Sequence, residues 1–394
     1  MLQAGVLEHN SAEAQRVPKP RLALLVNTLA PYRLPLYRLL AEQFEFAVFH
    51  GGRESNRATW QKLDEQIPKV TVKQSRGWQF RYARRRNGKK IDDAYLHLNV
   101  GYFVDLVRWR PEAVISAEMG LRTMLALAYG TVWRRPVWVW WGGTRHTERG
   151  TGLARRCLRW LMARVVRHWI SYGESSTEYL QALGVQRQRI LQIQNSVDES
   201  IFAPTSRTLR RSRAPTFLHV GRLVALKGVD RLLQSASRIQ LQGYEFELLL
   251  VGGGEKQSEF QALAGRLNLK NVRWEAEKPP NEMPEVYGRA DFLVFPTLED
   301  VWGLVANEAL LSGVPVLCSK YAGCAQEIVP KENTFDPLND EDFDRILIRA
   351  MEGRIASAES RTLRTSAQNA EAIIVSVMTT LERTGMSKSL RQQG

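Results

Sequence analysis

The sequence alternates short apolar runs with longer segments of helical periodicity, and this alternation is its strongest constraint on the fold. Runs such as "RLALLV", "PVWVWW", "FELLLV" and "DFLVF" are each followed, after a turn, by apolar residues recurring every three or four positions. Runs that are apolar throughout fit parallel strands covered by helices on both faces. We therefore predict an α/β fold.

The length and one polar break divide this alternation into two parts. The chain has 394 residues, too many for one ordinary core, and "APTSRTLRRSRAP" lacks apolar periodicity. We predict a loose tail at 1–20, one Rossmann-like domain at 21–202, a linker at 203–215 and a second Rossmann-like domain at 216–370. Open parallel sheets bind ligands at the carboxyl ends of their strands, so we expect the site in a cleft between the domains.

The net charge lies entirely in the first half. Residues 1–200 contain 31 Lys and Arg against 17 Asp and Glu, whereas the remaining residues contain 24 of each kind. This asymmetry suggests that the first domain faces a polyanion or an anionic membrane.

The cysteines and the amino terminus favour a cytoplasmic protein. Cys157, Cys318 and Cys324 lack the number and spacing of a disulfide framework or a cysteine metal site. The first residues lack the features of a signal peptide, and no run approaches the roughly 18 apolar residues that span a bilayer.

An acidic turn in the second half is the first candidate site. In "LEDVWGLVANEALLSGVPV", Gly303 is expected to begin a helix, whose free N–H groups favour an anion such as a phosphate. Glu308 would then accept hydrogen bonds from a ribose diol, and Asp300 would face the group beyond the phosphates. Alternatively, both acids complement the helix dipole, worth about 0.3–1 kcal/mol each.

Two cations accompany this turn in the same predicted domain. In "HVGRLVALKGVDRLL", Arg222 and Lys227 flank a loop between a strand ending at Gly221 and a helix. Cations spaced across such a loop suit a diphosphate. Solvated surface cations are the alternative, which the nearby acidic turn makes less attractive.

Four segments in order now reveal a resemblance. "VGRLVALKGVDRLL", "VGGGE", "ADFLVFPTLEDVWGLVANEALLSGVPV" and "GCAQEIV" resemble the donor-binding half of glycosyltransferase family 4, over roughly residues 170–330. The resemblance implies a retaining enzyme with the GT-B fold, in which two Rossmann-like domains face each other across a cleft. It also implies that a terminal helix, within 371–394, crosses back onto the first domain.

The family's motifs carry over residue by residue. They imply Arg222 and Lys227 on the donor diphosphate, Glu308 on the nucleotide ribose and Asp300 on the transferred sugar. The family usually has glutamate at the position of Asp300, so either Asp300 or its neighbour Glu299 could point inward. The remaining donor-binding candidates lie in the turns of these motifs: Gly221, Gly252, Gly253, Gly303 and Leu304.

The first domain offers weaker candidates for the acceptor side of the cleft. Arg33 at a helix entry could meet an anionic acceptor or a donor phosphate, or be a surface arginine. Glu118 follows a strand and could face the cleft or cap locally. Trp141 stands where relatives carry a histidine, with Arg145 and His146 just beyond, but a tryptophan-rich strand is more often core than sugar platform.

A basic segment with interleaved aromatic residues suggests membrane docking. From Arg53 to Lys90 there are twelve Lys and Arg against three acids, with Trp60, Trp78, Phe80 and Tyr82 among them. Basic residues attract anionic headgroups, and aromatic residues suit the water–lipid boundary. No nucleic-acid-binding motif accompanies the charge, so we expect no nucleic-acid partner. A solvated loop is the alternative.

We therefore predict a retaining glycosyltransferase, which moves a sugar from a UDP- or GDP-linked donor to a saccharide or lipid-linked acceptor. Cell-surface polysaccharide or glycolipid synthesis is the expected context, at the inner face of the plasma membrane. The donor is a co-substrate, and we expect no other cofactor and no metal site. The alternatives are a GT-B-fold sugar-nucleotide epimerase and a non-catalytic module that binds polyanions or membranes.

Overall fold

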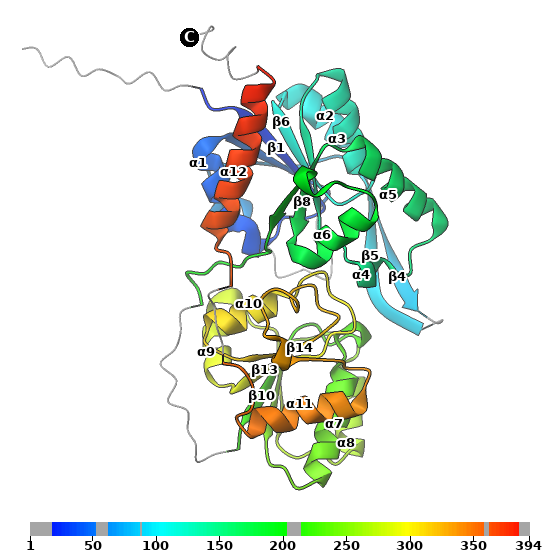
Figure 1. The fold of residues 1–394 in the computed structure, drawn as a ribbon, viewed down its shortest axis with the longest axis vertical. Coiled ribbons are helices and arrows are strands. Elements are labelled where there is room, and N and C mark those ends of the chain that lie inside the picture. Colours follow the sequence, from blue (N-terminus) through cyan, green and yellow to red (C-terminus); the bar gives the residue numbers. More distant parts are fainter. Residues whose placement is uncertain (1–17, 53–61, 87–88, 203–213, 358–361, 386–394) are drawn as a thin grey trace, which may run out of the picture.

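The protein consists of two α/β domains stacked along its long axis (Figure 1). The computed structural model describes residues 18–52, 62–86, 89–202, 214–357 and 362–385. Most of the predicted tail and linker therefore lies outside the described residues.

A seven-stranded parallel sheet forms the first domain, in the order β3-β2-β1-β6-β7-β8-β9. The central strands are buried along their whole length because helices cover both faces, as expected for continuous apolar runs. The strands of this sheet are β1 (Arg21–Val26), β2 (Glu45–His50), β3 (Thr71–Gln74), β6 (Ala113–Ala117), β7 (Val137–Trp141), β8 (His168–Tyr172) and β9 (Ile190–Ile193).

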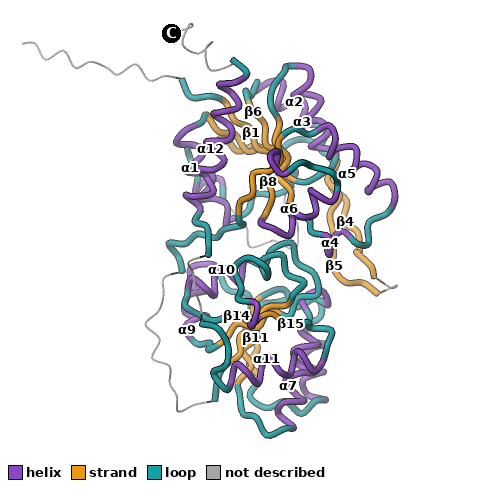
Figure 2. The backbone as a smooth tube through the Cα atoms, in the orientation of Figure 1, coloured by secondary structure: helices purple, strands orange, loops and turns teal. Residues whose placement is uncertain are grey.

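A six-stranded parallel sheet forms the second domain, in the order β12-β11-β10-β13-β14-β15. Figure 2 shows helices on both sides of this sheet as well. Its strands are β10 (Thr216–Val220), β11 (Glu247–Val251), β12 (Val272–Glu275), β13 (Phe292–Phe295), β14 (Val316–Ser319) and β15 (Thr334–Phe335). The prediction of parallel sheets with two Rossmann-like domains is confirmed.

The helices of both domains lie between successive strands in the chain, except α11, which follows the last strand. In the first domain these are α1 (Leu34–Gln43), α2 (Gly101–Trp109), α3 (Leu121–Val132), α4 (Arg145–Glu148), α5 (Leu153–Val165) and α6 (Gly173–Ala182). In the second they are α7 (Val229–Leu241), α8 (Gln257–Arg266), α9 (Met283–Gly288), α10 (Leu304–Leu311) and α11 (Asp340–Met351). Short 3₁₀ turns include η1 (Pro31–Arg33) and η5 (Ala225–Lys227).

An antiparallel hairpin, β4 (Trp78–Arg86) and β5 (Lys89–Leu98), projects from the first domain toward the second (Figure 1). The sequence analysis did not foresee these strands. Trp78, Phe80 and Tyr82 share one face of β4 because side chains alternate along a strand, and all three are exposed. The carboxyl-terminal part of the basic segment, from Trp78 on, therefore belongs to this hairpin.

The last described helix, α12 (Ser366–Arg383), leaves the second domain and packs on the first beside α1 (Figure 1). Its apolar side carries Ile373 and Val377, both fully buried, and joins a core cluster that includes Tyr37 and Leu40 of α1. Among the described residues, no helix combines the length and apolar character that crossing a bilayer requires.

We expect the packing of α12 to stabilise the first domain measurably. Ile373→Ala should lower the free energy of unfolding by about 2–5 kcal/mol, because it leaves a cavity among buried side chains. Val375→Ala on the exposed side of the same helix should change it by less than about 0.5 kcal/mol. Urea unfolding followed by circular dichroism measures both, and equal effects would contradict the described packing.

Candidate active site

Three loops of the second domain meet where β10, β11 and β13 end. Because these strands are neighbours in the parallel sheet, their loops share its carboxyl edge. The backbone N–H of Leu223 donates to the carbonyl of Gly253 (2.8 Å), and that of Leu298 donates to the carbonyl of Leu226 (2.9 Å). A Cβ atom at Gly252 would lie 2.0 Å from the carbonyl oxygen of Gly221, so this close approach requires glycine.

The predicted cation and acid at the centre of these loops contact each other. The Nζ atom of Lys227 lies 2.5 Å from Oδ2 of Asp300, and both side chains are largely buried. The other carboxylate oxygen of Asp300 accepts from the backbone N–H of Trp302 (3.1 Å). Asp300 therefore lies beside the predicted diphosphate-binding lysine.

The amino terminus of α10 lies at the same loop. Gly303 precedes the helix with a φ of 107°, and a Cβ there would lie 2.3 Å from the ring of Phe295. Only glycine is compatible with this backbone conformation and this contact. The helix begins at Leu304, immediately after the loop that contains Asp300. The free N–H groups of its first turn therefore lie next to that loop.

Glu308 lies in α10 and accepts a hydrogen bond from the hydroxyl of Tyr287 in α9 (2.6 Å). Burial raises the pKa of Glu308 to about 7, although the tyrosine hydrogen bond acts in the opposite direction. Tyr287 has a strongly raised pKa because it is fully buried beside this carboxyl group. One oxygen of Glu308 is thus fixed by Tyr287, and the carboxyl group can exchange a proton near neutral pH.

Arg222 and the buried His219 lie at the end of β10. Arg222 is partly buried, and its carbonyl accepts from the backbone N–H of Val224 (2.9 Å). Burial lowers the pKa of His219 to about 4, and the charge of Lys227 contributes in the same direction. His219 is therefore neutral at physiological pH, so the positive charge of this loop comes from Arg222 and Lys227.

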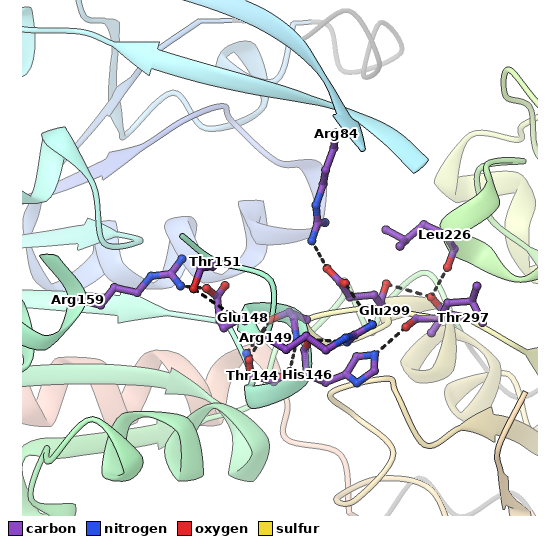
Figure 3. A network of polar contacts seen from close by, with 12 residues as sticks. Arg84, Thr144, His146, Glu148, Arg149, Thr151, Arg159, Leu226, Thr297 and Glu299 are labelled. Carbon is purple, nitrogen blue, oxygen red and sulfur yellow. Dashed lines mark hydrogen bonds and ion pairs between the residues drawn. The ribbon is translucent and has the colours of Figure 1, made fainter. Parts of the chain in front are cut away.

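Glu299 connects the two domains instead of joining the donor-binding loops. Its buried carboxylate forms ion pairs with Arg84 of the hairpin and with Arg149 after α4 (3.9 Å). Figure 3 shows both arginines reaching it from the first domain. Of the two adjacent acids, Asp300 therefore contacts Lys227 and Glu299 binds the first domain.

His146 reinforces the same contact between domains. Its Nε2 donates to the carbonyl oxygen of Leu298 (2.8 Å), and its ring stacks on Tyr321 at 4.3 Å between centroids. Thr144 caps the amino terminus of α4 by accepting from the N–H of Thr147 (3.2 Å). His146 therefore contacts the loop that leads to Asp300, while its neighbour Arg145 is exposed.

The expectation that Trp141 faces the cleft is wrong. Trp141 is buried in the first domain, where its Nε1 donates to the carbonyl of Gly143 (2.8 Å). Its ring stacks on Tyr179 and lies under the guanidinium of Arg159. The tryptophan-rich strand is core because both faces of β7 are covered by helices.

Glu118 and Arg33 lie at the carboxyl edge of the first sheet. Glu118 is largely exposed and forms an ion pair with Arg122 (3.1 Å). Arg33 packs against aromatic rings, with its guanidinium 4.6 Å from the centroid of Trp140 and 5.5 Å from that of Tyr172. Within the described part of the chain, its Nε has no hydrogen-bond partner.

Part of the basic segment contacts the second domain. Arg84 binds Glu299, and Lys90 forms an ion pair with Glu255, so these two charges are not directed outward. Trp60 lies outside the described residues.

Sequence reasoning missed four residues that complete the site, because their partners are distant in the chain. Tyr287 lies 21 positions before Glu308 and carries no motif of its own. Arg84 and Arg149 stood among many other arginines, and His219 within an apolar strand. In the described ranges, no group of three His, Cys, Asp or Glu side chains is arranged to hold a metal ion.

Each domain also contains a cavity at the carboxyl edge of its sheet. One of about 430 Å³ opens beyond β12, where Glu275, Lys278, Glu282 and Arg289 are among its lining residues. The other, of about 300 Å³, lies at the carboxyl ends of β1, β2 and β3 in the first domain. Its polar lining includes Thr28, His50, Lys62, Asp64 and Gln74.

Glu308→Gln should make stability less dependent on pH. In the folded protein the Glu308 carboxyl group keeps its proton up to about pH 7, whereas in the unfolded chain it loses the proton near the ordinary glutamate pKa of 4.5. The free energy of unfolding therefore falls as the pH rises between these two values. Glutamine accepts the Tyr287 hydrogen bond but never becomes charged. We expect similar melting temperatures at pH 5 and a variant that melts a few degrees higher than the parent at pH 8. The same difference at both pH values would contradict the assigned shift.

Comparison with known proteins finds a family model that matches the part of the chain containing these loops. Residues 205–370 match the model of the family described as Glycosyl transferases group 1. A D-inositol 3-phosphate glycosyltransferase of Nocardia farcinica is 27% identical over 170 residues, 40% of this chain and 38% of that protein. The lipopolysaccharide glucosyltransferase WaaG of Escherichia coli is 30% identical over 138 residues, 34% of this chain and 36% of WaaG. The matched region thus spans about a third of the length of these curated relatives.

The fold of the whole described chain resembles solved structures. Anabaena Alr3699/HepE in complex with UDP has a TM-score of 0.67 and 17% identity, covering 93% of this chain and 100% of that chain. The lipopolysaccharide outer core galactosyltransferase WaaB has a TM-score of 0.64 and 15% identity, covering 90% and 99%. At this identity the likeness concerns the fold, which is GT-B. Residues 205–370 therefore match the Glycosyl transferases group 1 family, and the chain has the GT-B fold.

Proposed function

We propose that the protein is a retaining glycosyltransferase that moves a sugar from a nucleotide-diphosphate sugar to a saccharide or lipid-linked acceptor. The observation that carries this proposal is the contact between Lys227 and Asp300 at the loop that leads to α10. A diphosphate needs cations and free N–H groups, and a transferred sugar needs a hydrogen-bond acceptor beside them. The second domain offers these groups at one edge of its sheet.

Lys227 would exchange one anion for another when the donor binds. Without the donor, Asp300 neutralises the ammonium group at 2.5 Å. A diphosphate, with more negative charge, would attract Lys227 and leave Asp300 to accept hydrogen bonds from the sugar. Arg222 and the amino terminus of α10 would add positive charge. As the glycosidic bond breaks, these groups stabilise the charge that grows on the leaving phosphate.

Glu308 would bind the ribose. Tyr287 already occupies one side of its carboxyl group, so the group is held in a fixed orientation. The carboxylate can accept hydrogen bonds from both hydroxyls of a vicinal diol. Hydrogen bonds from the ribose hydroxyls would also stabilise the ionised carboxylate, which burial deprives of water. Binding would therefore favour deprotonation of Glu308.

For the transfer step, we propose attack of the acceptor hydroxyl on the same face that the nucleoside diphosphate leaves. The hydroxyl proton would pass to a departing phosphate oxygen, so that no protein nucleophile or cofactor is needed. The nucleotide sugar is then the co-substrate. Closure of the two domains would exclude water, which otherwise competes for the sugar.

The nucleotide is proposed to be UDP. The Anabaena protein was solved with UDP and with UDP-glucose, which supports a uridine donor through likeness of fold alone. The cavity beyond β12 lies beside the donor loops, since β12 pairs with β11, and it could accommodate the base.

The acceptor is proposed to bind the first domain. The cavity at the ends of β1, β2 and β3 is lined by hydroxyl, imidazole and amide groups suited to a saccharide. The net positive charge of this half supports an acidic or lipid-linked acceptor and an anionic membrane as partner. We therefore propose a cytoplasmic protein that associates peripherally with the inner face of the plasma membrane.

Donor binding should depend on both cations. UDP-sugars should raise the melting temperature of the parent protein, and Arg222→Ala and Lys227→Ala should each weaken donor affinity about tenfold or more. Transfer should fall by about a hundredfold or more, because leaving-group stabilisation is lost. Arg345→Ala, an exposed arginine on α11, is the matched control and should bind the donor normally.

Thermal-shift screening of sugar nucleotides and product analysis with lipid-linked acceptors supply the measurements. Unchanged donor affinity in both variants would refute the site. A parent protein that no sugar nucleotide stabilises would indicate a non-catalytic module. An isomerised donor without any transferred sugar would indicate an epimerase.

A further inference from the structure

Helix α5 presents an apolar face that nothing in the described structure covers. Leu153, Trp160, Leu161 and Val165 are 76%, 51%, 53% and 56% exposed. Leu153 and Trp160 are two turns apart and Leu161 and Val165 one turn apart, so each pair is aligned along the helix, and the two pairs occupy adjoining parts of its exposed surface. Single exposed apolar residues are ordinary, but four on one face of a 13-residue helix mark an interaction surface.

The opposite side of α5 already packs into the first domain. Met162 and Ala163 are buried in a core cluster with Trp169 and Val166. The exposed face is therefore additional to the side that the fold needs. Its large side chains are not explained by packing within the chain.

Arginines surround the exposed apolar face, and no acid accompanies them. Arg155, Arg156, Arg164 and Arg167 are all exposed, and residues 149–173 contain no Asp or Glu. The guanidinium of Arg164 lies 3.3 Å from the centroid of the Trp160 ring. Apolar residues flanked by arginines are typical of helices that lie in the interface of an anionic membrane.

The charge pattern distinguishes among occupants of this face. A second copy of the chain, related by a two-fold axis, would place arginine opposite arginine. A nucleic acid would attract the arginines but would leave the aliphatic side chains exposed to water. An anionic membrane suits both the arginines and the apolar side chains, because its headgroups attract the basic residues and the boundary of its acyl chains buries the apolar ones.

We propose that α5 lies in the interface of an anionic membrane, with Trp160, Leu161 and Val165 immersed and the flanking arginines at the headgroups. This inference rests on the proposed function in one respect: docking would give the enzyme access to a lipid-linked acceptor.

A chain of contacts connects α5 to the donor loop. On the inner side of α5, Arg159 forms an ion pair with Glu148 of α4 (Figure 3). Arg149, the next residue, contacts Glu299, and His146 of the same helix binds the carbonyl of Leu298. The loop that contains Glu299 is therefore connected to α5 through α4.

Vesicle flotation of the full chain tests this placement. The parent protein should float with vesicles of phosphatidylcholine and phosphatidylglycerol, and much less with phosphatidylcholine alone. Trp160→Glu combined with Leu161→Glu should weaken binding at least about tenfold. Leu241→Glu introduces a single negative charge at a leucine of the second domain that is 82% exposed, and should bind as the parent does. Equal binding of the double variant and the parent would overturn the proposal, as would a parent that fails to bind anionic vesicles.

A fluorescent label gives the immersion of α5 independently of affinity. Cys157 is exposed on this helix, whereas Cys318 and Cys324 are buried, so a thiol-reactive polarity probe labels α5 selectively. Anionic vesicles should shift its emission to the blue, and quenchers carried on lipid acyl chains should quench it. Unshifted, unquenched emission from vesicle-bound protein would overturn the proposal by showing that another surface binds.

The donor-dependent thermal shift separates this inference from the proposed function. The double variant in α5 should keep that shift. A shift without vesicle binding refutes membrane docking and leaves the proposed glycosyl transfer standing, whereas vesicle binding without any shift refutes the proposed donor site and leaves docking standing.

Discussion

Lys227 and Asp300 lie 73 residues apart in the sequence, and their ion pair determines how the two halves of the donor site meet. The ammonium belongs to the loop after β10, and the carboxylate to the loop after β13, the neighbouring strand. Neither side chain is fully exposed, so each would lose solvation without the other. The pair keeps both loops in place and leaves a cation that a more highly charged anion can recruit.

Glu299, the residue before Asp300, binds the first domain instead of Lys227. A buried carboxylate without partners would be costly, and both of the partners described here, Arg84 and Arg149, come from the first domain. The loop that holds Asp300 is therefore anchored to the first domain on one side and to Lys227 on the other. A movement of one domain relative to the other would change the surroundings of Glu299 and Asp300. Domain closure is therefore linked to the donor site.

The sequence was sufficient to predict those parts of the structure that depend on neighbouring residues in the chain. Strand, loop and helix follow one another within about ten residues around Gly221 and Gly303, so periodicity and the glycine positions predict their geometry. It was insufficient where partners are remote. Tyr287 beside Glu308, and Arg84 beside Glu299, depend on the packing of whole elements, which no local pattern encodes.

Aromatic residues in strands show why exposure is harder to predict than the strand itself. Trp78, Phe80 and Tyr82 were expected in a basic loop, yet their spacing of two is that of a strand, which the structure shows with all three exposed, and their membrane docking stays a prediction. Trp141 lies in a strand buried on both sides, where alternation no longer separates inner from outer positions. Exposure could not be read from the residue types alone.

A crystal structure with bound UDP would test the central claim most directly. The account predicts diphosphate oxygens within hydrogen-bond distance of Arg222, Lys227 and the first N–H groups of α10, with both ribose hydroxyls on Glu308. Asp300 should be separated from Lys227 and turned toward the space beyond the diphosphate. A nucleotide bound elsewhere, with the Lys227–Asp300 pair intact and Glu308 contacting only Tyr287, would contradict it.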